Sequence, residues 1–122
     1  MIVIELPYPP TVNHYWGRRG KRTFITKKGD DFRRDVIIKC MQEKKQLVLS
    51  GRLDVEVLLF VPDRRKRDID NITKSLLDSL SHAHVWEDDE QIDVLTIRRM
   101  ERIKGGKCIV KIKEVESERE GN

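Results

Sequence analysis

The sequence predicts an α+β fold in which one domain of 122 residues packs a mixed β-sheet against two main helices. Four segments rich in β-branched and apolar residues, at 2–6, 53–61, 92–100 and 108–115, favour strands. Two longer segments, beginning near residues 28 and 69, place apolar residues at helical spacing instead. The sequence shows neither a linker nor an internal repeat, and a chain of this length buries one core. We therefore expect a single domain over residues 1–122.

The first strand, at 2–6, ends at Pro7, because proline cannot donate a hydrogen bond to a neighbouring strand. A basic loop broken by glycine follows over 8–21, and a short strand follows over 23–26. Tyr15 and Trp16 suit either core packing or stacking on an exposed base, and we expect core packing. Thr26 is suited to cap a helix over 28–45. The buried stripe of that helix is predicted to contain Phe32, Val36, Ile37, Cys40 and Met41.

The segment 53–61 begins as an alternating strand and ends as a continuous apolar run. That change is typical of a central strand whose far end is buried on both faces. The segments 92–100 and 108–115 are predicted to form two strands joined by a hairpin turn that contains Gly105 and Gly106. Residues 116–122 are polar, and we expect this tail to fray.

The charged residues are segregated along the chain, whose net charge is +4. Lys and Arg dominate 18–34 and 98–113, whereas acidic residues gather at 87–93. This distribution favours a protein that binds a polyanion and also holds a cation, although solvated surface remains the alternative for any single basic residue. Cys40 and Cys108 lack metal-binding spacing, and no segment resembles a membrane span or a secretion signal. We expect a cytoplasmic protein that does not bind membranes.

The stretch 60–93 carries the residues best suited to catalysis. Asp68 and Asp70 are separated by Ile69, so in extended backbone their carboxylates project to the same side. Lys74 follows Asp70 by four residues, which places the two side chains next to each other on a helix. The buried face of that helix is predicted to carry Ile72, Leu76, Leu77 and Leu80.

The helix is predicted to end near 83–85, so that the returning chain brings Asp88 or Asp89 beside the first two aspartates. Carboxylate oxygens are ligands that Mg²⁺ and Mn²⁺ prefer, and such ions activate water and orient a phosphodiester. Two alternatives stay open at this point. Asp68, Asp70 or Asn71 can serve only to cap the helix, and the acidic cluster can be a solvated turn.

The motifs that contain these residues resemble those of the RusA family of Holliday-junction resolvases. The family's core pattern of Pro-Asp, arginines, Arg-Asp-apolar-Asp-Asn and a later Lys is present at 62–74. Its Trp-x-Asp-Asp is present at 86–89, its Leu-Pro-x-Pro-Pro-(Ser/Thr)-x-Asn at 6–13, and its Lys-Gly-Gly at 104–106. The likeness therefore covers nearly the whole chain.

The resemblance implies a Mg²⁺-dependent endonuclease, with Mn²⁺ as a substitute, that places paired symmetric nicks in four-way DNA junctions during recombination and repair. It implies catalytic and metal-binding roles for Asp68, Asp70 and Asp89, an essential lysine at Lys74, and Asp88 as a further candidate ligand. Such an enzyme associates with the nucleoid while on DNA. We expect DNA contacts from the asparagine and basic residues Asn13, Arg18, Arg19, Lys21, Arg22, Arg64, Arg65, Lys66 and Arg67.

The resemblance also implies a homodimer, and the symmetry of a four-way junction agrees, because one domain with one acidic cluster supplies one nick. An apolar sheet edge and the strand at 53–61 are the candidate interfaces. Two other functions remain open: a nuclease that prefers flaps or forks, and a DNA-binding module without activity. A pure binding module is disfavoured, because the acidic residues would repel phosphate unless a cation lies between them.

Overall fold

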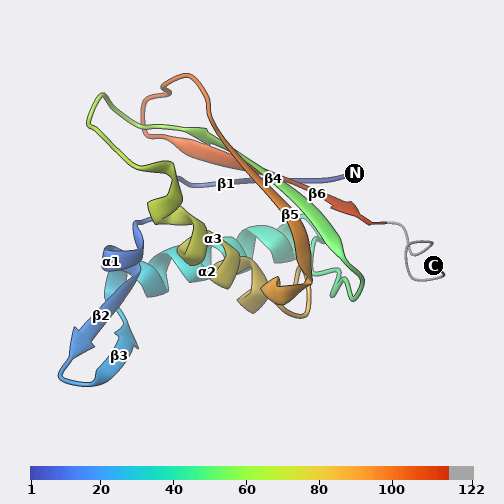
Figure 1. The fold of residues 1–122 in the computed structure, drawn as a ribbon, viewed down its shortest axis with the longest axis horizontal. Coiled ribbons are helices and arrows are strands. Elements are labelled where there is room, and N and C mark those ends of the chain that lie inside the picture. Colours follow the sequence, from blue (N-terminus) through green and yellow to red (C-terminus); the bar gives the residue numbers. More distant parts are fainter. Residues whose placement is uncertain (116–122) are drawn as a thin grey trace.

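The computed structural model describes residues 1–115, which form an α+β domain with one mixed sheet, one small hairpin and two main helices (Figure 1). The predicted fraying of 116–122 lies outside the described residues. The main sheet has the order β1-β6-β4-β5, with bounds Ile2–Leu6, Lys107–Glu114, Leu53–Phe60 and Ile92–Arg99 respectively. β6 runs antiparallel to β1 and β4, whereas β5 runs parallel to β4. The prediction of a mixed sheet is therefore confirmed.

β4 is an inner strand of this sheet, as its apolar pattern predicted. Its alternate side chains Leu53, Val55 and Leu59 are fully buried in the core. Phe60, at the end of the strand, is also buried, so the alternation gives way to a buried run there. Direct backbone pairing with β5 on one side and β6 on the other fixes this strand and the loop that follows it.

The predicted hairpin between the last two strands is wrong. β5 and β6 pair with opposite sides of β4 and not with each other. The tight turn itself is present: the Gly106 N–H donates to the Ile103 carbonyl at 2.8 Å, and Gly105 has a φ of +83°. The prediction failed because it assumed that consecutive strands are neighbours, whereas the helical crossover after β4 leaves β4 between them.

The helices α2 (Lys27–Gln42) and α3 (Thr73–His82) lie on one face of the main sheet (Figure 1). Thr26 caps α2 as predicted, because its hydroxyl accepts a hydrogen bond from the Gly29 N–H at 2.9 Å. The predicted stripe of α2 is buried at Phe32, Val36 and Cys40. Met41 is 59% exposed, because it lies roughly 100° around the helix axis from Cys40 and so leaves the buried stripe.

The region predicted as a basic loop is more regular than expected. A short helix, α1 (Val12–Tyr15), leads into a two-stranded hairpin of β2 (Trp16–Arg19) and β3 (Arg22–Ile25). This hairpin projects away from the main sheet (Figure 1). Tyr15 is fully buried, which confirms core packing, and Trp16 is half-buried. The strand signal was weak because charged side chains and a glycine follow Trp16.

Within residues 1–115, no helix is both long enough and apolar enough to span a membrane.

Candidate active site

The loop after β4 leads into η1 (Ile69–Ile72), a 3-10 turn, and then directly into α3. The sequence predicted one helix from Ile69 onward, but its first turn has the tighter 3-10 geometry. The predicted buried face is confirmed, with Ile72, Leu76, Leu77 and Leu80 all in the core. This packing anchors η1 while Asp68, Asp70 and Lys74 remain exposed.

Helix capping does not account for the carboxylates at the start of η1. Asp68 occupies the N-cap position, but its side chain makes no capping hydrogen bond. The backbone supplies that contact instead, because the Asn71 N–H donates to the Asp68 carbonyl at 3.3 Å. Within residues 1–115, the side chains of Asp68, Asp70 and Asn71 form no hydrogen bond. The two carboxylates are therefore available to a ligand.

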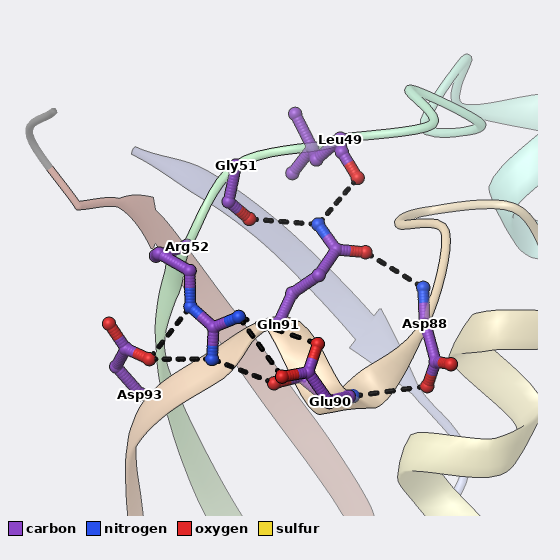
Figure 2. A network of polar contacts seen from close by, with 7 residues as sticks. All are labelled: Leu49, Gly51, Arg52, Asp88, Glu90, Gln91 and Asp93. Carbon is purple, nitrogen blue, oxygen red and sulfur yellow. Dashed lines mark hydrogen bonds and ion pairs between the residues drawn. The ribbon is translucent and has the colours of Figure 1, made fainter. Parts of the chain in front are cut away.

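A buried glutamine fixes the acidic segment that returns after α3. Gln91 is 6% exposed, and its amide nitrogen donates to the carbonyls of Leu49 and Gly51 at 2.8 Å each (Figure 2). Its side-chain oxygen accepts from the backbone N–H groups of Glu87 at 2.9 Å and Asp88 at 2.7 Å. The sequence analysis missed Gln91, because its partners near residue 50 are distant in the chain.

The acidic residues of this segment divide into structural and unengaged groups. Asp88 caps η2 (Asp89–Gln91), since its Oδ1 accepts from the Glu90 N–H at 3.1 Å. Arg52 forms ion pairs with Glu90 at 3.2 Å and with Asp93 at 2.7 Å (Figure 2). Within residues 1–115, Asp89 receives neither a capping N–H nor an arginine, although it adjoins Asp88. Of the acids predicted as ligands here, Asp89 is thus less engaged than Asp88.

The electrostatic surroundings of Asp89 connect this segment to α3. Partial burial raises the pKa of the Asp89 carboxyl, and a hydrogen bond and charge repulsion from Asp88 raise it further. The Lys74 ammonium lowers this pKa, while the Asp78 carboxylate raises it. Lys74 and Asp89 therefore lie close together, whereas the approach of Asp88 or Asp89 to Asp68 and Asp70 stays a prediction. Within residues 1–115, however, no group of three or more His, Cys, Asp or Glu side chains is already arranged to hold a metal ion.

The basic loop at 64–67 is partly occupied by structural contacts. Arg67 binds Asp63 through two hydrogen bonds of 2.5 and 3.0 Å, and the Arg65 N–H donates to the same carboxylate at 2.9 Å. These contacts hold the pKa of Asp63 well below its usual range. Arg67 also lies over the Tyr8 ring, 5.8 Å from its centroid. Arg64 and Lys66 are exposed and are better placed than Arg67 to reach a ligand.

The β2–β3 hairpin brings a second basic surface to α3. Its predicted DNA-contacting residues Arg18, Arg19, Lys21 and Arg22 are all exposed. A cleft of about 580 Å³ lies between the hairpin and α3, lined by Val12, Asn13, Trp16, Gly17, Arg18, Thr23 and Lys74. The hairpin and the predicted catalytic lysine thus face a common space.

Exposed carboxylates and a lysine on an α+β domain, set between two basic surfaces, are the features of a nuclease that uses a metal ion. Comparison with known proteins narrows this class. The family model for endodeoxyribonuclease RusA matches residues 7–113, and the chain belongs to this family.

Several curated proteins are similar to the chain over most of their length. A crossover junction endodeoxyribonuclease of Enterobacteria phage HK97 is 47% identical over 112 residues, covering 92% of this chain and 93% of the relative. The corresponding proteins of Escherichia coli K12 and Enterobacteria phage 82 are 31% and 32% identical over 115 residues. Each of those alignments covers 94% of this chain and 96% of the relative.

Proposed function

We propose that this endodeoxyribonuclease resolves four-way DNA junctions by metal-dependent hydrolysis at a site formed by Asp68, Asp70, Asp89 and Lys74. Its relatives are named crossover junction endodeoxyribonucleases, and we infer from that name that this chain also acts on DNA junctions. One observation carries the proposed site: Asp89 lies close enough to Lys74 for the lysine to lower its pKa. Lys74 in turn lies one helical turn after Asp70, whose carboxylate, like that of Asp68, is unengaged within residues 1–115. We further propose that residues 1–122 make up one endonuclease domain.

The nuclease family implies a metal ion, and we propose Mg²⁺, for which Mn²⁺ can substitute. Mg²⁺ commonly keeps several waters and takes only one or two protein carboxylates, so it does not need a complete protein cage. Asp68 and Asp70 fit this requirement, since their oxygens have no partner within residues 1–115. When bound, the ion activates water and stabilises the charge on the phosphodiester.

The chain's own groups hold the reactants in place. We assign Asp68, Asp70 and Asp89 to the metal, and Asp88 to the support of η2, because its Oδ1 is used as a cap. The Lys74 ammonium lies where it can neutralise negative charge that develops on the phosphate. Gln91 sets the position of Asp89, because its side chain binds the Asp88 N–H at the start of η2 and the Leu49 carbonyl of the neighbouring segment.

DNA binding is proposed for the hairpin and for the loop before η1. Arg18, Arg19, Lys21 and Arg22 carry the charge of the hairpin, and Arg64, Arg65 and Lys66 that of the loop. Contacts of this kind go mainly to phosphates and orient the DNA without reading its sequence. We place Asn13 with the hairpin, because it lines the cleft that Lys74 also lines.

A homodimer is proposed because two symmetric nicks require two sites related by two-fold symmetry. The strand at 53–61 cannot add a second copy through its backbone, because β5 and β6 already flank it. The free edges of the sheet are β1 and β5. We favour β5, where Val94 is 46% exposed and Leu95 is 38% exposed.

The proposal is tested by cleavage of a labelled synthetic four-way junction beside linear duplex, in Mg²⁺ and in EDTA. We expect paired symmetric nicks in the junction alone, only in Mg²⁺. Equal cutting of flaps or forks would show a broader nuclease. Tight junction binding without cleavage in Mg²⁺ or Mn²⁺ would replace the proposal with a DNA-binding module.

A further inference from the structure

A second cleft, which none of the proposed catalytic steps uses, lies beside Asp68. Its volume is about 370 Å³, and it is lined by Tyr8, Thr11, Lys66, Arg67, Asp68, Asn71 and Ile72. Its walls come from three separate segments: the chain after β1, the basic loop, and η1. The cleft therefore opens next to a proposed metal ligand.

Three uncharged polar side chains of this cleft form no side-chain hydrogen bond in the part of the chain that the structure describes. The Tyr8 hydroxyl is buried and forms no hydrogen bond within residues 1–115. Thr11 precedes α1 without capping it, and the Asn71 carboxamide likewise makes no hydrogen bond in the described chain. Buried polar groups are rarely left unpaired in folded proteins. Of the three, only the Tyr8 hydroxyl is buried, whereas Thr11 is half-buried and Asn71 is exposed, and this unpaired buried hydroxyl indicates a missing polar ligand.

The cleft is held in shape by the motifs around it. Arg67 is fixed on the Tyr8 ring by its two hydrogen bonds to Asp63. Behind Tyr8, the positive-φ turn of Gly106 fits closely, since a Cβ there would lie 2.9 Å from Pro62 and 3.0 Å from the Tyr8 Cβ. The Tyr8 hydroxyl is thus held in place before any ligand arrives.

The chemistry of these groups suits a nucleobase better than a phosphate. Asp63 already neutralises Arg67, which is the most enclosed cation of the cleft. A carboxamide presents one donor side and one acceptor side, and hydroxyl groups both donate and accept. Such groups match the hydrogen-bonding edges of bases, which asparagine reads in many protein–DNA complexes.

We propose that this cleft binds a nucleobase next to the scissile phosphate, and that Tyr8 and Asn71 determine which base is accepted. The inference rests on the proposed function, since the proposed metal ligand Asp68 lines the cleft and so places it beside the bond that is cut. A base in stacked duplex cannot enter a side pocket of this kind, whereas an unstacked base at a branch point can. The cleft therefore couples the sequence at the cut to the branched structure of the substrate.

The first test measures cleavage of a set of four-way junctions that carry each of the four bases at the positions flanking the cut. We expect the wild-type protein to prefer one base at one position. Tyr8→Phe and Asn71→Ala should each reduce that preference by about tenfold, because each removes a base contact. Thr73→Val is the matched control, as it removes another buried, unpartnered hydroxyl that does not line the cleft. A wild-type protein without preference, or variants with an unchanged preference, would overturn the inference.

A second test does not depend on cleavage. The Asp70→Asn protein, in Ca²⁺, is mixed with junctions that carry 2-aminopurine at each flanking position in turn. We expect the fluorescence of one position to change on binding, and the change to disappear when Tyr8→Phe or Asn71→Ala is added. Equal signals with and without those changes would refute the base-binding cleft even if the protein proved unable to cut junctions. Failure of cleavage alone would instead count against the proposed function.

Discussion

Asp88 and Asp89 adjoin in the sequence, yet their carboxylates meet different partners. Asp88 caps a backbone turn, whereas Asp89 lies close enough to Lys74 for that ammonium to lower the pKa of the Asp89 carboxyl. We therefore predict that Asp89→Ala abolishes cleavage with little effect on folding. Asp88→Ala should lower the free energy of unfolding by about 1 kcal/mol, as the loss of a cap does. It should retain much of the cleavage rate.

Single-turnover cleavage and urea unfolding of both variants check this contrast. Glu87→Gln, at an exposed acid in the same segment, is the control for the loss of one negative charge. If Asp88→Ala were as inactive as Asp89→Ala while remaining equally stable, Asp88 would belong to the metal site.

The ion pair of Asp63 predicts how stability depends on pH. The folded state holds the pKa of Asp63 below its unfolded value, because Arg67 and the Arg65 N–H bind the carboxylate. The pair therefore stabilises the protein above the unfolded pKa of about 3.9 and loses this effect as the pH falls toward the folded pKa. We expect Asp63→Asn to weaken the fall in unfolding free energy between about pH 5 and pH 2, measured by urea denaturation. An unchanged pH profile in this variant would contradict the contact.

At the scale of residues, the sequence provided the candidate site residues but did not show which of them are engaged in structural contacts. The Asp-apolar-Asp motif and Lys74 were found because their spacing is local. The ion pairs of Arg52 with Glu90 and Asp93 were not predictable, since Arg52 precedes these residues by 38 and 41 positions in the chain. The engagement of Arg67 by Asp63 was also missed, although the two are only four residues apart.

α3 is tied to α1 and α2 by a polar network at the base of the hairpin. The Tyr15 hydroxyl donates to Asp78 at 2.6 Å, and Arg33 donates to the same carboxylate at 2.8 Å. Removing the carboxylate takes away the acceptor that both groups share, so that within residues 1–115 the Tyr15 hydroxyl keeps only Ser79 and Arg33, and Arg33 keeps only Tyr15. We predict that Asp78→Ala lowers the free energy of unfolding by about 1–3 kcal/mol.

Urea unfolding beside Asp31→Ala tests this prediction. Asp31 pairs with Lys27 on the exposed side of α2, so its loss should cost much less, because exposed ion pairs contribute little to stability. Equal costs for the two changes would mean that the network at Tyr15 contributes no more than a surface ion pair.

The elements themselves were largely predictable, because hydrophobic periodicity specifies them locally. Both long helices, the cap at Thr26 and the four strands of the main sheet agree with the sequence. The pairing of β5 was not predictable in this way, since strand order depends on where α3 carries the chain. β3 agrees with the short strand predicted over 23–26, but β2 and its pairing with β3 were missed, because solvated strands lack an apolar alternation.

Within residues 1–115, the main sheet has two free edges, β1 and β5, and the proposed dimer requires one of them. We predict that a double change at β5, Val94→Lys with Leu95→Lys, yields a monomer in analytical ultracentrifugation. Charged side chains on an edge strand oppose pairing with another copy. The monomer should lose paired nicking while single nicks persist.

Val3→Lys, on the opposite edge strand β1, is the matched control, since Val3 is 44% exposed. It should leave the dimer intact. Dissociation by this change alone would place the interface at β1, and a wild-type monomer on junction DNA would exclude the dimer.

The central claim is that carboxylates on two separate segments act through a metal ion while basic surfaces bind the junction. The most direct measurement compares single-turnover cleavage and junction affinity for wild-type protein and Asp70→Asn in Mg²⁺. The account predicts that cleavage is abolished while affinity is kept or strengthened, because a ligand and a negative charge are removed together. Cleavage at the wild-type rate, or a loss of affinity in step with cleavage, would contradict it.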